Sequence, residues 1–397
     1  MDNDSKILKT KRRPDVRKIT VVLMITVLII SMPSHLLAEN KNILTWQKAS
    51  VLLQGSNNVL KDLSEAEQES RKQYEEAAET AKTIDTKGET IKILDEEIRI
   101  AYDDATQMLK TQQKELYPEQ MRFYWNMSQD TQKRTANSLL LSLRSLYLGL
   151  YSAHSNMKIR EKKYEVAESL HIQNKLRFEK GMISETDVLE SEYGLQKAKA
   201  ELDAARRNRE NALRNFNMLL CQDIDTEYDD IKPESQFYTS LKDYDYYLGR
   251  ALSYRAEIKQ AEKQLMLLEM KKEFIERFPM SLNTTSIRKD YNNLLLDIEI
   301  QKAKIEQVRL DIEVDTEKAY VEAVSAVRNM ENMKKLMEIQ KSNIEKTRTM
   351  YGKGMISKTA LDQAEIAYLE FCSSYDMTLF DCNTKLMKLI YVSGTGL

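Results

Sequence analysis

Glycine and proline are scarce in this sequence, whose 397 residues include 10 glycines and 5 prolines. These residues build turns and interrupt helices, whereas charged residues, which suit solvated helical surfaces, make up 31% of the chain. Few turn-forming residues and many charges favour long helices over an α/β enzyme or a β-sandwich. The sequence therefore predicts an all-α fold with little or no β-structure.

Histidine and cysteine are rarer still, with three of each. The sequence has no Cys-x-x-Cys pair, no His-Glu-x-x-His segment and no phosphate-binding glycine loop, so a zinc site, a Cys/His catalytic pair and a nucleotide site lack their usual residues. A formal net charge of -2 provides no basic footprint for nucleic acid. We predict no enzymatic activity, no catalytic residues, no metal, no cofactor and no nucleic-acid partner. We interpret the cysteines as buried free thiols; they are Cys221, Cys372 and Cys382.

Residues 1–38 have the features of an export signal. Seven basic residues precede an apolar run that extends from Ile19 to Ile30. A helix that spans a bilayer needs about 20 residues, so this shorter run favours a signal peptide over a membrane anchor. Pro33 ends the run, and the peptide bond between Ala38 and Glu39 is the expected cleavage site. An uncleaved anchor is the alternative, because residues 31–37 would lengthen the span.

Beyond residue 38, the few prolines and glycines divide the chain into predicted helices. In the helix expected at 184–220, apolar residues follow a heptad spacing that Arg209 interrupts, which indicates coiled packing against other helices. Residues 221–243 contain several aspartates and Pro233, and predict an irregular link. The remaining helices are expected at about 45–115 (bent near residues 85–88), 119–180, 244–277, 287–352 and 356–392.

The sequence also contains an internal repeat. Residues 180–186 read KGMISET and residues 353–359 read KGMISKT, at an offset of 173. The same offset aligns Tyr147 with Tyr320, whereas the helix starts at 58–61 and 256–259 match at an offset of 198. The halves therefore differ in length within their first helices, through an inserted helical segment or, in part, a turn near Gly88. We predict two repeats, 39–220 and 244–397, joined by the link 221–243.

Each KGMIS segment stands between two long predicted helices. Glycine allows the positive φ of a tight reversal, and a serine can cap the helix that follows. Each repeat is therefore expected to end in a long antiparallel helical hairpin. We predict the tip residues to form the turns and, in addition, to dock a partner; they are Gly181, Met182, Ile183, Ser184, Asp187, Gly354, Met355, Ile356 and Ser357.

The order of these elements resembles that of the TolC, or outer membrane efflux protein, family. The resemblance covers about residues 43–395, and its motifs occur in the family's order and are duplicated. The motifs are Leu44-Thr45 with Ala49, Arg177-Phe178 with the first KGMIS segment and Asp187, Asn211-Ala212-Leu213, Arg255-Ala256-Glu257-Ile258, and Phe278-Pro279.

The resemblance implies a homotrimer whose helices form a hollow duct. It implies passive transport with no catalysis, and hairpin tips that meet a membrane-fusion adaptor and an inner- or cytoplasmic-membrane transporter. The family default is an outer-membrane location, with a pair of membrane strands between the first and second long helices of each repeat. In this sequence the space for strands is short, about 279–287 in the second repeat and 116–119 in the first, although residues 121–125 could form one short strand. We therefore expect an exported protein of the cell envelope that is reduced to the helical part of the family.

The second tip departs from the family pattern as well. The family narrows its channel with acidic residues six and nine positions after the second tip glycine, and Ala360 and Gln363 occupy these positions here. Asp187 is retained at the equivalent place in the first tip. Two functions therefore remain open at this point. One is a helical conduit for efflux or secretion, and the other is a non-conducting helical-hairpin spacer or structural protein of the cell envelope.

Overall fold

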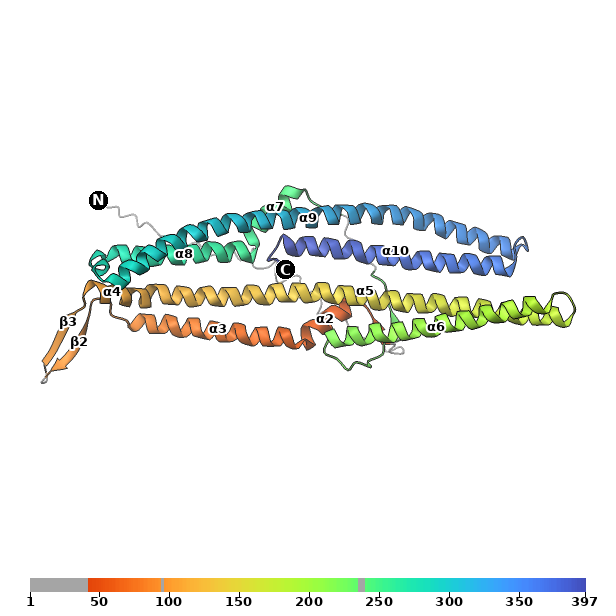
Figure 1. Ribbon diagram of the computed structural model, residues 1–397, viewed down its shortest axis with the longest axis horizontal. Coiled ribbons are helices and arrows are strands. Elements are labelled where there is room, and N and C mark those ends of the chain that lie inside the picture. Colours follow the sequence, from red (N-terminus) through yellow and green to blue (C-terminus); the bar gives the residue numbers. More distant parts are fainter. Residues whose placement is uncertain (1–41, 94–95, 235–239) are drawn as a thin grey trace, which may run out of the picture. The chain divides into compact units, whose positions relative to one another are not determined.

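The computed structural model describes residues 42–93, 96–234 and 240–397. The predicted export signal lies outside these residues. The part from Ile43 to Leu397 forms one compact unit, in which helices dominate and long antiparallel hairpins occur twice (Figure 1). The predicted all-α fold, with its duplicated hairpins and little β-structure, is confirmed.

The first repeat begins with α2 (Trp46–Ser56) and α3 (Asn58–Thr83). Asn57 separates them and caps α3, because its side chain accepts a hydrogen bond from the Leu60 amide. After a β-hairpin, α4 (Asp104–Thr111) and a π-helical turn (Gln112–Leu116) run directly into α5 (Tyr117–Glu179), and α6 (Glu185–Leu219) returns along it. We predicted a break between two helices near residues 116–118, but this break does not exist, and Pro118 lies in the first turn of α5. The π-helical turn before it accommodates a residue that has no amide hydrogen to donate.

The β-hairpin between α3 and α4 corrects the sequence analysis. β2 (Gly88–Ile93) pairs antiparallel with β3 (Glu96–Ala101), and Ile91 lies opposite Ile98. The helix predicted over 45–115 is thus wrong between Thr83 and α4, and residues 121–125 are helical. Isoleucines at 91, 93, 98 and 100 alternate with the period of a strand, which is the signal that we missed. The extra length of the first repeat lies in this hairpin and α4.

The second repeat consists of α7 (Tyr244–Tyr254), α8 (Ala256–Arg277), α9 (Thr285–Gly352) and α10 (Lys358–Val392). We predicted one helix over 244–277, but Arg255 is extended at φ -62° and ψ 137° and separates α7 from α8. Its guanidinium pairs with Glu257 and Asp315 at 2.8 and 3.0 Å, which holds the junction against α9. A 3-10 turn (Pro279–Asn283) occupies the place that the β-hairpin takes in the first repeat.

The two repeats share part of their core. In the first repeat α5 packs against α3 and α6, and in the second α9 packs against α8 and α10. Helices α5 and α10 also contact each other. Phe380 of α10 is fully buried among first-repeat residues, and its ring centroid lies 5.4 Å from that of Tyr147. The repeats are therefore joined by hydrophobic packing as well as by the chain.

The link between the repeats is tied to the start of the described chain. β1 (Ile43–Leu44) and β4 (Asp230–Ile231) form a two-residue parallel pair. The predicted irregular link thus contains one short strand, which holds it over α5. Within the described residues, we find no helix with both the length and the apolar character needed to cross a membrane.

Candidate functional site

Both hairpin tips are built by the same turn. Gly181 and Gly354 have φ values of 71° and 70°, in the left-handed region that only glycine adopts at little cost. The amide of Gly181 donates to Phe178 O at 2.8 Å and that of Met182 to Arg177 O at 2.9 Å. The second tip repeats these two bonds with Gly354 and Met355. This is the Schellman ending of a helix, and it explains the glycine of each KGMIS segment.

The serine of each segment begins the next helix. Ser184 Oγ accepts a hydrogen bond from the Asp187 amide at 3.2 Å, and the Asp187 carboxylate accepts one from the Ser184 amide at 2.8 Å, which makes a capping box. Ser184 Oγ also donates to the Asp187 carboxylate at 2.8 Å, and this bond, together with the one from the Ser184 amide, lowers the pKa of Asp187. Ser357 caps α10 through the amide of Ala360, which offers no carboxylate in return. Asp187 therefore has a local structural role, and the second tip lacks its equivalent.

The methionines of the tips are large apolar side chains that are exposed to solvent. Met182 is 69% exposed and Met355 is 68% exposed. Ile183 and Ile356 beside them are half-buried. The structure therefore places all nine predicted residues at the two tips and presents a methionine to solvent at each. Large apolar side chains in such positions can bind an apolar surface of a partner.

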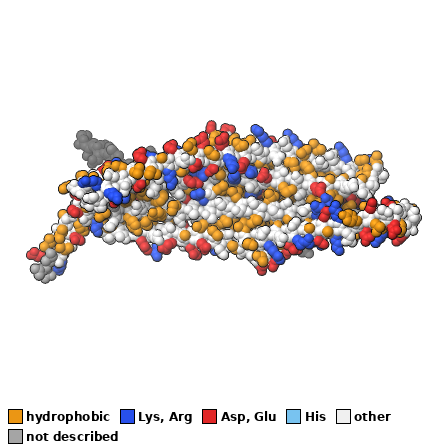
Figure 2. Space-filling view, in the orientation of Figure 1, with side chains coloured by type: hydrophobic (Ala, Val, Ile, Leu, Met, Phe, Trp, Pro, Cys, Tyr) orange, Lys and Arg blue, Asp and Glu red, His pale blue; other side chains and the backbone are white. Residues whose placement is uncertain are grey.

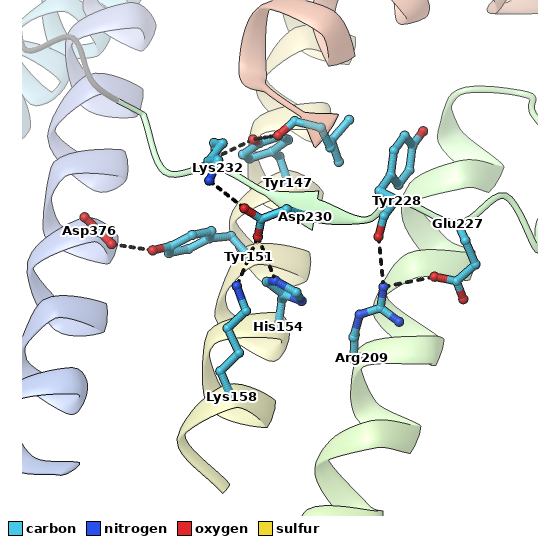
Figure 3. Close-up of polar contacts among 11 residues, drawn as sticks. Tyr147, Tyr151, His154, Lys158, Arg209, Glu227, Tyr228, Asp230, Lys232 and Asp376 are labelled. Carbon is cyan, nitrogen blue, oxygen red and sulfur yellow. Dashed lines mark hydrogen bonds and ion pairs between the residues drawn. The ribbon is translucent and has the colours of Figure 1, made fainter. Parts of the chain in front are cut away.

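A polar cluster near the middle of α5 is the other notable site, and sequence reasoning did not find it (Figure 3). Asp230, in the link, accepts hydrogen bonds from Lys158 at 3.0 Å and from Lys232 at 2.6 Å, and lies 3.3 Å from His154 Nε2. Burial raises the pKa of Asp230, but the hydrogen bonds from Lys232, Lys158 and His154 outweigh it and lower the pKa well below the ordinary value. Asp230 is thus an ionised anchor for the link.

Two buried tyrosines of α5 extend the cluster. Tyr147 donates a hydrogen bond to Lys232 O at 2.7 Å, and its hydroxyl lies 3.2 Å from Leu44 O, so it reaches both β1 and the link. Tyr151 donates to Asp376 of α10 (Figure 3). Burial raises the pKa of both tyrosines far above the ordinary value, with smaller contributions from nearby carboxylates. Both hydroxyls therefore stay protonated and hold structure together.

His154 and His171 are buried packing residues. His154 is 5% exposed and His171 is 6% exposed, and they have different partners, Asp230 and Ser191. Burial, followed by the nearby charge of Lys158, lowers the pKa of His154 although Asp230 opposes the shift. His154 is therefore neutral near pH 7.

Arg209, which interrupts the predicted heptad of α6, has a structural explanation. Its guanidinium binds Glu227 at 2.9 Å and Tyr228 O at 3.4 Å (Figure 3). Asn217, which lies further along α6 and is fully buried, donates to Ile224 O and Thr226 O. These side chains hold the first part of the link against α6. Their bonds to the link explain why polar residues occur on α6.

The described residues contain no group of three or more His, Cys, Asp or Glu side chains placed to hold a metal ion. The three cysteines are free, but Cys221 is exposed and Cys372 half-buried, so our interpretation of all three as buried thiols holds only for Cys382. Burial, with the charge of Asp381, raises the pKa of Cys382 to about 11, which keeps this thiol protonated and unreactive.

Comparisons with known proteins give a consistent answer at the level of structure. No protein-family model matches the sequence, and no curated protein does so either. Among solved structures, the chain is similar to the Neisseria gonorrhoeae MtrE outer membrane channel, with a TM-score of 0.57 and 15% identity over 88% of this chain and 89% of that one.

Two further solved structures are similar to a comparable degree. The Campylobacter jejuni CmeC outer membrane channel matches with a TM-score of 0.56 and 13% identity over 100% of this chain and 94% of that one. CusC, described through its folding and transmembrane channel formation, matches at 0.57 and 11% identity over 88% and 92%. The predicted resemblance to the TolC, or outer membrane efflux protein, family is therefore confirmed: this chain has the fold of those channels.

Proposed function

We propose that this chain is a subunit of a helical duct for efflux or secretion, that three copies form the duct, and that transport through it is passive. The observation that carries the proposal is the fold match, which includes 88% or more of this chain and about nine-tenths of each channel compared. A spacer protein would not need both repeats to keep the arrangement of a channel subunit.

We propose the two hairpin tips as the docking sites for a membrane-fusion adaptor, which would connect the duct to a membrane transporter. The turn itself favours a glycine for the left-handed residue and a capping residue such as serine at the start of the next helix. It does not require a methionine, yet both tips present one that is more than two-thirds exposed. Two similar tips per chain, each with an exposed methionine, support contact with a repeated partner surface. The expected location is the cell envelope.

The mass of the protein in solution tests this proposal. The chain from residue 39 onward would be studied by size exclusion with light scattering, without detergent, because Ile43–Leu397 is a compact unit by itself. We expect a discrete trimer. A soluble monomer at all accessible concentrations would contradict the duct and favour the spacer. Aggregates that only detergent disperses would contradict an assembly held together by its helices.

A further inference from the structure

The β2–β3 hairpin stands apart from the helical core of the first repeat. In Figure 1 both strands extend away from α4, and the second repeat has a 3-10 turn at this place. No described side chain of residues 88–101 belongs to a buried hydrophobic cluster. The hairpin precedes α5 and the tip at Gly181 follows it, so the two lie at opposite ends of this helix. A segment that the core does not use indicates a role outside folding.

One face of the hairpin is apolar and exposed. Successive side chains of a strand point to opposite faces, and Ile91 lies opposite Ile98, so these two share a face with Ile100. Ile98 and Ile100 are 43% and 45% exposed. Figure 2 shows hydrophobic side chains on the projecting hairpin, with charged ones beside them. We call this surface the isoleucine face; its members are Glu89, Ile91, Glu96, Ile98 and Ile100.

The outer edge of β3 is open. Within the described residues β3 pairs with β2 alone, and all six residues of β3 are exposed. Proteins usually protect such an edge with lysine, proline or a bulge. The sequence of β3 is EEIRIA, and its register with β2 has no bulge. Its one basic residue, Arg99, pairs with Asp85 of the same chain at 2.7 Å. The edge can therefore accept a further strand.

The charge of the isoleucine face indicates the chemistry of its partner. Its two charged residues, Glu89 and Glu96, are acidic and exposed, and neither forms an ion pair with another described residue. The basic residues of the strands, Lys92 and Arg99, lie on the opposite face, so the isoleucine face of a second copy offers no positive charge. A membrane is disfavoured as well, because segments that bind anionic lipid surfaces carry lysine and arginine beside their apolar residues.

We propose that β3 binds an extended segment of a partner protein as a third strand. The segment lies antiparallel to β3, the arrangement with the more stable pairing. Two apolar residues of the segment cover Ile100 and Ile98, and a lysine or arginine two residues later pairs with Glu96. Main-chain hydrogen bonds provide affinity in such a complex, and side chains at alternate positions provide specificity. This binding is independent of the duct and of docking at the tips.

A synthetic peptide tests strand addition in the chain from residue 39 onward. The probe is Thr-Val-Thr-Val-Thr-Lys with a fluorescent N-terminal label, and it places its valines opposite Ile100 and Ile98 and its lysine opposite Glu96. We expect fluorescence anisotropy to show saturable binding tighter than about 1 mM. The peptide Thr-Thr-Val-Val-Thr-Lys has the same composition but points its valines to opposite faces, so it should bind about fivefold more weakly or less. Replacement of residues 88–101 by a linker should abolish binding of the probe.

Charge reversal tests the basic residue of the partner. Glu96→Lys should weaken binding of the probe by about fivefold or more, because like charges then meet across the strands. A peptide with glutamate in place of its lysine should bind this variant better than it binds the wild type. Glu97→Lys makes the same charge change on the opposite face of β3 and should keep the preference for the lysine peptide. Loss of that preference in both variants, or in neither, would contradict the pairing with Glu96.

Methylation of the peptide nitrogens separates strand addition from binding by side chains alone. Alternate residues of a strand make the hydrogen bonds to one neighbour. A probe methylated on its valine and lysine nitrogens and a probe methylated on its threonine nitrogens should therefore differ, and only one of them should bind. Equal effects of the two methylation patterns would overturn the added strand. Binding of the chain to vesicles of phosphatidylcholine and phosphatidylglycerol that requires the hairpin, or a fall in the mass of the chain's assembly when the hairpin is removed, would assign the face to a membrane or to a second copy instead.

Discussion

At the scale of single residues, Cys221 has an unfavourable backbone conformation. Its φ is 52°, and it is the only non-glycine residue among those described that has a positive φ. Its amide donates to Met218 O, and that of Gln222 donates to Asn217 O, both at 3.1 Å. Cys221 thus occupies the glycine position of the same turn that ends α5 and α9 at the tips. The offset of 173 places Gly394 of the second repeat on Cys221, but Gly394 does not have a positive φ.

Cys221→Gly is expected to stabilise the protein. The left-handed conformation costs a non-glycine residue about 1–2 kcal/mol. Glycine avoids this cost but loses about 0.5–1 kcal/mol of the gain, because its unfolded chain has more conformational freedom. The free energy of unfolding, measured with urea, should therefore rise by up to about 1 kcal/mol. Cys221→Ser removes the thiol but keeps a side chain on the left-handed residue, so the free energy of unfolding of this variant should not rise. A glycine variant less stable than the serine variant would contradict this account.

At the scale of elements, the β2–β3 hairpin differs from the helices in how it is held. Its contacts with its surroundings lie near its base, where Arg99 pairs with Asp85 at 2.7 Å and the Tyr102 amide donates to Lys87 O at 3.0 Å. Ile98 and Ile100 are 43% and 45% exposed. Gly88 is required at the base, because a Cβ there would come within 2.4 Å of Ile100 O. The hairpin thus adds little to the helical core.

Replacement of residues 88–101 by a short glycine-serine linker should leave the helices intact. The exposed strands bury few apolar groups, and exposed ion pairs contribute about 0–1 kcal/mol each. We expect the helical circular dichroism signal to persist and the melting temperature to change by no more than about 4 °C. A matched deletion within α3 should be far more harmful, because α3 packs along α5. Loss of the cooperative transition in the hairpin variant would show that the strands support the core.

At the scale of the whole molecule, a buried ion pair joins the two repeats to the link. Arg144 of α5 is 3% exposed, and its guanidinium pairs with Glu234 of the link. Asn383 of α10 donates to the same carboxylate at 2.6 Å. One charge pair thus contacts the first repeat, the link and the second repeat. Removing one member of such a pair leaves a buried charge without its partner.

Arg144→Met should therefore destabilise the protein by about 3–5 kcal/mol. The double variant Arg144→Met with Glu234→Gln removes both charges and should recover a large part of that loss. Thermal unfolding followed by circular dichroism measures the difference. If the single variant costs no more than an exposed pair such as Arg71 with Glu75, about 1 kcal/mol or less, the ion pair does not hold the repeats together.

The amino-acid sequence by itself determined the helical class, the two repeats and the turns at their tips. These features depend on interactions within a few residues: the scarcity of glycine and proline, the heptad spacing of α6, and the glycine and serine of each KGMIS segment. The alternating isoleucines at 88–101 also indicated a β-hairpin there. The low turn content and the strong helical pattern on both sides led us to extend a helix through it.

Only the tertiary structure decided which distant residues meet. Nothing near Asp230 in the sequence indicates that it anchors the link to Lys158 and His154, and nothing near Arg144 indicates Glu234. Burial and pairing of such side chains depend on how the two repeats pack, which is a property of the whole fold and not of local spacing.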